Sequence, residues 1–190
     1  MNWVNQYVKP YLEIIIMIAV GHDINPGDEL AKHLLPAMEA PYQGLKRIDL
    51  WYINVVTPLQ LSWLQVSHPP SAGQFVEQSL LTIRPIIKFM MEHINYRVKP
   101  SHKIILCDLY PYYASMNDPA YSNISLDYAL LINSSNVIVQ DGDIGYTNLL
   151  DGLVDDFISA IEKIGLFNDQ GLIYIGATGW PITSGRRDDD

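Results

Sequence analysis

Three side chains suited to acid–base or metal chemistry stand at the ends of predicted strands. His22 and Asp23 follow the apolar segment 14–21, and Asp108 lies at the end of the apolar segment 103–109. The carboxyl ends of parallel strands carry the chemistry of an α/β fold, because they meet at one edge of the sheet. The three residues are also ligand types for zinc. No paired spacing such as His-x-x-x-His accompanies them, so we predict neither a metal site nor a cofactor.

The single cysteine, Cys107, has no partner for an intrachain disulfide. It follows Ile104, Ile105 and Leu106 in an apolar run, which predicts a buried, unreactive thiol rather than a nucleophile.

Strand-like and helix-like segments alternate along the chain. A continuous apolar run predicts a strand covered on both faces, and apolar residues at three-to-four spacing predict a helix. The predicted strands are 14–21, 50–56, 103–109 and 172–176, and the predicted helices are 26–44, 75–93 and 146–164. Four strands joined by helices of this length imply right-handed βαβ crossovers in a parallel sheet.

Local signals refine this outline. Pro85 predicts a kink or an early break in the second helix, and Gly165 predicts the C-cap of the third. We expect loops at 68–73, at 110–113 and at 117–123, and a small extra strand at 137–139.

Composition limits the function classes. The chain has 190 residues, of which 48% are hydrophobic, so one domain is expected. Asp and Glu outnumber Lys and Arg by 21 to 12, for a net charge of −9, which argues against nucleic acid as a partner. The longest apolar stretch has about eight residues, whereas a membrane span needs about 20. Residues 1–6 lack the regions of a signal peptide.

Several loops together match one enzyme family. Residues 67–75 read Ser-His-Pro-Pro-Ser-Ala-Gly-Gln-Phe. This segment resembles the pattern Ser-aromatic-Pro-Pro-Ser-x-Gly-x-Phe of glycoside hydrolase family 17, the plant-type β-1,3-glucanases, and only His68 departs from it. Further segments that resemble family signatures follow in the family's order, at 110–113, 124–130, 139–142, 145–149 and 179–181.

The resemblance implies an α/β fold that is a partial (β/α)8 TIM barrel. It covers about units four to seven, so about four βα units of parallel sheet are expected within a single domain, 1–182, followed by a polar tail, 183–190. A half barrel leaves two open edges. Self-association through these edges, a partner chain or misfolding are the alternatives.

Members of the family are retaining glycosidases, which need an acid/base and a nucleophile carboxylate about 5–5.5 Å apart. The family pattern Val-Gly-Asn-Glu reads Val-Gly-His-Asp at 20–23, which gives Asp23 the acid/base position with a shorter side chain. The pattern Ser-Glu-Ser-Gly-Trp-Pro reads Gly-Ala-Thr-Gly-Trp-Pro at 176–181. Ala177 therefore occupies the nucleophile position without an oxygen, and no Asp or Glu lies within five residues of it.

The resemblance also suggests substrate-binding residues. Tyr110, Tyr113 and Trp180 offer aromatic surface of the kind on which sugar rings stack, with core packing as the rival account. Trp180, followed by Pro, also fits a structural plug. His22 replaces a family Asn and is either a glycan contact or an ordinary hydrogen-bonding residue at a strand end.

We therefore expect β-1,3-glucan, as oligosaccharide or polysaccharide, to be the partner, with hydrolysis impaired at Asp23 and Ala177. The alternatives are a glucan-binding pseudoenzyme and a truncated gene product without its own function. The family is mostly secreted, but the sequence gives no localisation. Asn123 and Asn133 lie in glycosylation sequons that matter only in the secretory pathway.

Overall fold

The computed structural model describes residues 3–92, 94–95, 102–117, 124–132, 136–167 and 171–181. The predicted tail, 183–190, and the sequon residues Asn123 and Asn133 lie outside these ranges, as does most of the predicted loop 117–123.

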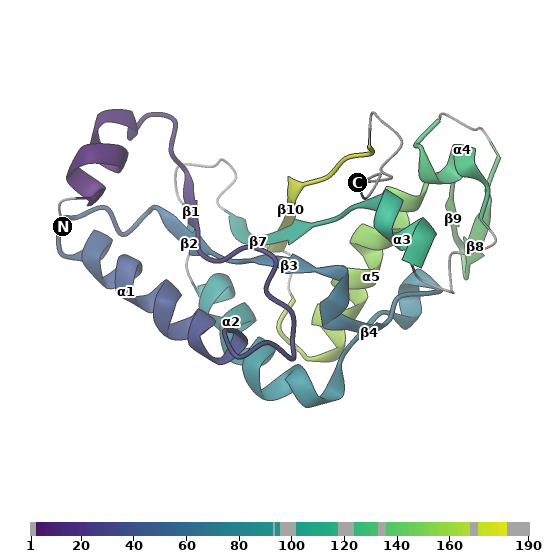
Figure 1. Ribbon diagram of the computed structural model, residues 1–190, viewed down its shortest axis with the longest axis horizontal. Coiled ribbons are helices and arrows are strands. Elements are labelled where there is room, and N and C mark those ends of the chain that lie inside the picture. Colours follow the sequence, from purple (N-terminus) through teal and green to yellow (C-terminus); the bar gives the residue numbers. More distant parts are fainter. Residues whose placement is uncertain are drawn as a thin grey trace, which may run out of the picture.

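Parallel strands follow one another across the molecule (Figure 1). They are β1 (Met17–Ala19), β2 (Asn54–Val56), β3 (Pro58–Gln60), β7 (His102–Asp108) and β10 (Gly171–Ala177). β1 pairs with β2, β3 pairs with β7, and β7 pairs with β10, all in parallel. Only Thr57 separates β2 from β3, so the strand predicted at 50–56 begins later, at Asn54, and is followed almost directly by β3 beyond its predicted end. The predicted parallel α/β arrangement is confirmed.

Three long helices lie along one side of these strands (Figure 1). They are α1 (Leu34–Lys46), α2 (Leu80–Glu92) and α5 (Leu149–Lys163). The predicted early break at Pro85 is wrong, because α2 continues through it. Its neighbours Ile83, Ile86 and Ile87 are fully buried, and their packing offsets the lost backbone hydrogen bond. Gly165 follows α5 with φ +71°, which confirms the predicted C-cap.

Shorter elements fill the connections. The expectation of a loop after β7 is wrong, because α3 (Pro111–Asn117) begins there. The small strand predicted at 137–139 lies two residues later, as β8 (Val139–Asp141), which forms a hairpin with β9 (Ile144–Tyr146). Further short strands are β4 (Leu64–Val66), β5 (Gln74–Phe75) and β6 (Ile94–Asn95). Short helices are η1 (Val4–Val8), η2 (Lys9–Tyr11), η3 (Ala31–His33), η4 (Leu61–Trp63), η5 (Pro70–Ala72), η6 (Glu77–Ser79) and α4 (Leu126–Ala129). In the described part of the chain, none of the helices has the length and apolar character that a membrane crossing requires.

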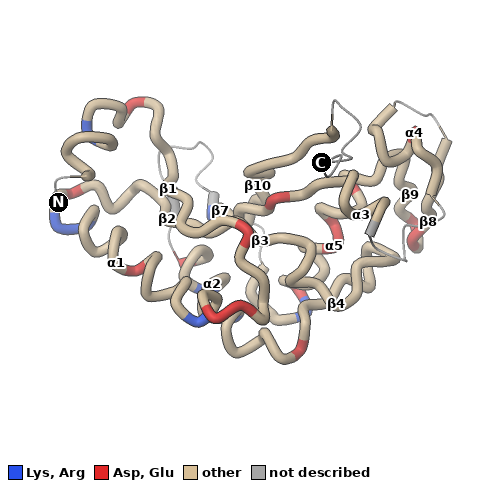
Figure 2. The backbone as a smooth tube through the Cα atoms, viewed as in Figure 1, with Lys and Arg blue, Asp and Glu red and all other residues tan. Residues whose placement is uncertain are grey.

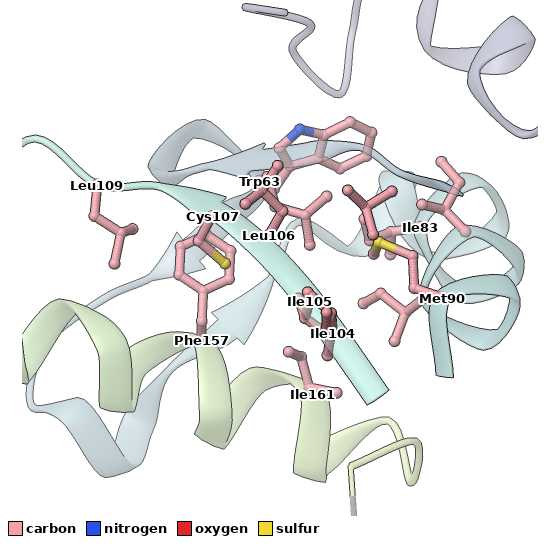
Figure 3. Close-up of a cluster of buried hydrophobic side chains, with 14 of the residues drawn as sticks. Trp63, Ile83, Met90, Ile104, Ile105, Leu106, Cys107, Leu109, Phe157 and Ile161 are labelled. Carbon is pink, nitrogen blue, oxygen red and sulfur yellow. The ribbon is translucent and has the colours of Figure 1, made fainter. Parts of the chain in front are cut away.

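The core is built around β7. Figure 3 shows this strand between two helices. Ile83 and Met90 of α2 lie on one side of it, and Phe157 and Ile161 of α5 lie on the other. Consecutive β7 residues from Ile104 to Cys107 are buried, and each aliphatic side chain of this size contributes roughly 1.5–3 kcal/mol on burial. Burial also raises the pKa of the Cys107 thiol, with a smaller contribution from Asp108. The predicted burial of Cys107 is therefore confirmed.

Helix α2 offers a matched test of this packing. Replacement of the fully buried Ile83 by Ala should lower the free energy of unfolding by about 2–5 kcal/mol, because a cavity is left beside β7. Leu81 on the same helix is 90% exposed, so Leu81→Ala should change it by less than about 0.5 kcal/mol. Urea unfolding of both variants measures the difference. Equal effects would show that α2 does not pack as described.

Candidate active site

The loop after β1 presents Asp23 at the carboxyl end of the strands. Asp23 adopts φ +50°, a left-handed conformation in which Asp is enriched among non-glycine residues. The loop is anchored twice: Gln60 Nε2 donates to Asp23 Oδ1, and Trp63 Nε1 donates to the carbonyl oxygen of Ile24 at 3.0 Å. His22 Nδ1 lies 2.9 Å from Asp23 Oδ2, and both side chains are mostly exposed. The Asp23 carboxylate therefore faces solvent in a held position.

Strand register places three further residues in one row. Gln60 is in register with Asp108. Asp108 is paired with Ala177 after a register irregularity between Ile175 and Ala177 on β10. Neighbouring strands lie about 4.8 Å apart, so the row runs from the partner of Asp23 across β7 to Ala177 on β10. The carbonyl oxygen of Ala177 accepts a hydrogen bond from the Leu109 N–H at 2.9 Å, which fixes the end of β10 against β7.

Asp108 is a buried carboxyl group within this row. It is 5% exposed, and the backbone N–H of Ala177 donates a hydrogen bond to it. Burial raises the pKa of Asp108, and the negative charge of Asp23 raises it further, whereas His22 and the Ala177 N–H lower it. Asp108 thus shares its electrostatic environment with both residues of the loop after β1.

Gly176 leaves room for this carboxyl group. A Cβ atom at Gly176 would lie 2.7 Å from Asp108 Oδ1 and 2.9 Å from Leu106 Cδ1. Real Cβ atoms do not approach so closely, so a side chain at position 176 would displace Asp108. The absence of a side chain at Gly176 on β10 therefore leaves the space that Asp108 and Leu106 of β7 occupy.

An aromatic row connects the ends of β7 and β10. The ring centroids of Tyr110 and Tyr113 are 5.6 Å apart, those of Tyr113 and Tyr112 are 5.3 Å apart, and those of Tyr112 and Trp180 are 5.1 Å apart. These spacings are typical of favourable edge-to-face pairs. Tyr113 is exposed, whereas Tyr110 and Trp180 are half-buried. Trp180 also packs against the core.

Tyr110 is linked electrostatically to the carboxylates. Burial raises its pKa, followed by the charges of Asp108 and Asp23 and a smaller contribution from Tyr113. The Tyr110 hydroxyl group therefore keeps its proton at neutral pH and can donate a hydrogen bond.

The segment 67–75 is fastened on two sides. Asp141 of β8 accepts hydrogen bonds from the Ser71 N–H at 2.6 Å and the Ser71 hydroxyl at 2.8 Å. Lys163 at the end of α5 donates to the carbonyl oxygens of Ser71 and Gly73 at 2.9 and 2.8 Å. Gly73 must be glycine, because a Cβ atom there would lie 2.1 Å from the Asp156 carbonyl oxygen. Hydrogen bonds thereby join three segments that are far apart in the sequence: 67–75, β8 and the end of α5.

The structure brings most of the expected site residues to one region. Asp23, Asp108 and Tyr110 interact electrostatically, and Ala177 lies beside Asp108. Acidic residues, red in Figure 2, lie near the labels β3 and β10 in the middle of the molecule, while basic residues are scattered. Within the described ranges no three His, Cys, Asp or Glu residues are grouped so as to hold a metal ion. Gln60 was not predicted, and its only sequence signal is its place four residues after the second buried segment.

A family model now decides the relationship. The model for glycosyl hydrolases family 17 matches residues 1–188. The chain belongs to this family.

Curated relatives agree with that membership. A "probable glucan endo-1,3-beta-glucosidase" (BG4) of Arabidopsis thaliana is 35% identical over 182 residues, which cover 95% of this chain and 48% of that protein. A "putative glucan endo-1,3-beta-glucosidase" (GVI) of Hordeum vulgare is also 35% identical, over 97% of this chain and 54% of that protein. The family 17 chain thus spans about half the length of these relatives.

Solved structures of the family have the same architecture. One is a plant beta-glucan endohydrolase, from a pair with distinct substrate specificities. It matches this chain with a TM-score of 0.78 at 29% identity, over 97% of this chain and 56% of that one. A β-1,3-glucanase and allergen of Cryptomeria japonica pollen gives the same TM-score at 30% identity, over 97% and 55%. The predicted partial (β/α)8 barrel is confirmed.

Asp108 and Asp141 should alter stability in opposite directions as pH changes. The pKa of Asp108 is raised in the folded chain, so the unfolded chain releases this proton first, and stability falls as pH rises from about 3 through the folded pKa. The pKa of Asp141 is lowered, mainly by the Ser71 hydrogen bonds. Its contribution is fully present above the unfolded pKa of about 3.9 and is lost as pH falls through the folded value.

Thermal melts between pH 3 and pH 7 test both signs. As pH rises, the Tm difference from the parent should become more positive for Asp108→Asn and more negative for Asp141→Asn. Asp143→Asn, at the exposed turn of the same hairpin, is the matched control for the loss of one carboxylate. The same trend in both test variants would contradict the described environments.

Proposed function

We propose that this family 17 chain acts on β-1,3-glucan and hydrolyses it poorly, because position 177 carries a methyl group. The carrying observation is the row across the strand ends, in which Ala177 lies opposite Asp108 and beyond Gln60 and Asp23. The family resemblance assigns the nucleophile to position 177 and the acid/base to Asp23. A methyl group neither attacks an anomeric carbon nor stabilises an oxocarbenium-like transition state.

The position of Asp23 supports general-acid catalysis that is weakened rather than lost. Its carboxylate remains at the strand end and exposed, and Gln60 holds one of its oxygens. The side chain is one C–C bond shorter than Glu, and a misplacement of about 1 Å can cost about a hundredfold in rate. Asp23 at the acid/base position and Ala177 at the nucleophile position together account for impaired hydrolysis, although the loops around them still resemble the family signatures.

The aromatic row supports retained glucan binding. Tyr110, Tyr113 and Trp180 extend from the carboxylates to the end of β10, and aromatic rings offer the flat apolar surface that sugar rings contact. His22, whose Nδ1 lies 2.9 Å from Asp23 Oδ2, offers a further polar contact. A glucan-binding protein without hydrolysis is the second candidate, and it rests on this same row.

Restoring the missing carboxylate tests impairment. Ala177→Glu should raise hydrolysis of laminari-oligosaccharides by at least about a hundredfold, because it supplies the charge on which the transition state depends. The neighbouring variant Thr178→Glu adds the same charge outside the register row and should give no gain. Release of reducing ends by the purified proteins measures both. High activity in the parent chain, unchanged in Ala177→Glu, would contradict the assignment of position 177.

Calorimetry tests binding separately from catalysis. Tyr110→Ala should weaken binding of a laminari-oligosaccharide about tenfold, the effect of about 1.4 kcal/mol, because it removes an aromatic surface beside the carboxylates. Tyr7→Ala changes another exposed aromatic residue, on η1, and should bind like the parent. Equal affinities of the two variants, or no binding by the parent, would contradict a glucan-binding role for the row.

A further inference from the structure

We propose that two copies of this chain join edge to edge and close one barrel between them. The edge strand β10 of each copy pairs in parallel with the edge strand β1 of the other. The partner that fits the open edges is therefore a second copy of this chain. This assembly does not depend on the glucan specificity proposed above.

Strands β1 and β10 are the two edges of the parallel strands. Among the described residues, β1 pairs only with β2, and β10 pairs in parallel only with β7. Figure 1 shows β1 and β10 along the upper side of the strands, with α1 and α2 along the lower side. The open edge of a sheet presents a row of backbone N–H and C=O groups, which is a template for pairing with another strand.

Burial distinguishes these edges from the strands between them. β2 is buried throughout, and β7 is buried from Ile104 to Cys107. In the apolar run that contains β1, Ile14 is 74% exposed and Ala19 is also exposed, while Ile175 of β10 is 40% exposed. Apolar strands of a parallel sheet are normally covered on both faces. The sequences of β1 and β10 therefore suit a covered environment that one copy does not provide.

Strand direction makes the two edges complementary. The pairings of β1 with β2, of β3 with β7 and of β7 with β10 are all parallel, and β2 leads almost directly into β3. The two edge strands thus run in the same direction. A twofold axis along the barrel axis preserves that direction, so it sets β10 of each copy beside β1 of the other. Both seams then form together, and the sheet closes without an open edge.

The number of strands also fits two copies. In the described part of the chain, β1, the β2–β3 segment, β7 and β10 take four strand positions, and a (β/α)8 barrel has eight. The solved family structures are matched over 56% and 55% of their own chains. Two copies therefore supply the strands of one barrel, and a third copy would exceed them.

The mass of the purified 190-residue chain in solution is the first test. One chain is 21.5 kDa, and light scattering after size-exclusion chromatography should give twice that mass. Ile175→Lys places a charge on the β10 edge, where a lysine blocks strand pairing, and should give the mass of one chain. Leu81→Lys adds the same charge on α2, at a residue that is 90% exposed, and should stay dimeric.

The other masses each overturn the proposal. A monomeric parent chain rules out a second copy, and a segment outside these 190 residues is then the cover of the two edges. A mass above two chains shows edge contacts that do not close into a ring. A dimer that persists in Ile175→Lys, or that is lost equally in Leu81→Lys, shows that the copies meet elsewhere.

Cross-linking tests which edges meet. Ala19→Cys and Ile175→Cys each add an accessible thiol, because both positions are exposed and the native Cys107 is buried. A short bismaleimide should convert the double variant Ala19→Cys/Ile175→Cys into covalent dimers on a denaturing gel, because paired strands lie about 4.8 Å apart. Each single variant should remain monomeric on the gel, since the twofold axis sets like edges on opposite sides of the barrel.

The cysteine variants also keep the proposal testable where Ile175→Lys does not fold, because they introduce no charge at the edge. Cross-linking of either single variant as strong as that of the double variant overturns the pairing of β1 with β10. Failure of the double variant to cross-link overturns it as well.

Discussion

The parallel register of β3, β7 and β10 is the constraint on which the site depends. It aligns Gln60, Asp108 and Ala177 across three strands, and Gln60 in turn holds Asp23 on the loop after β1. Because register in a buried parallel sheet is fixed by packing on both faces, these residues keep their order across the site. A register irregularity between Ile175 and Ala177 on β10 brings Ala177 level with Asp108.

That register is held by the core beneath it. β7 lies between α2 and α5 (Figure 3), and its side chains from Ile104 to Cys107 are buried against them. α5 also carries Lys163, which fastens the segment 67–75, while Asp141 fastens the same segment from the hairpin. Two of the segments that resemble family 17 signatures, 67–75 and 139–142, are therefore joined directly to each other by hydrogen bonds.

In the proposed function, the residues at positions 23 and 177 change the chemistry more than the architecture. Ala177 keeps its backbone hydrogen bond to Leu109, and Asp23 keeps a carboxylate at the strand end. Replacing a glutamate side chain at a strand end costs little packing, because the end faces solvent rather than the core. The end of β10 therefore stays bonded to β7 with an alanine at position 177.

The sequence by itself determined the alternation of strands and helices, the family, and the residues at positions 23 and 177, because buried runs, helical spacing and loop motifs are local signals. It missed the helix beginning at Pro111, although a proline at the first helical position is itself a local start signal. Only the tertiary structure decided that Asp108 stands opposite Ala177, because strand register joins residues far apart in the chain and leaves no local trace.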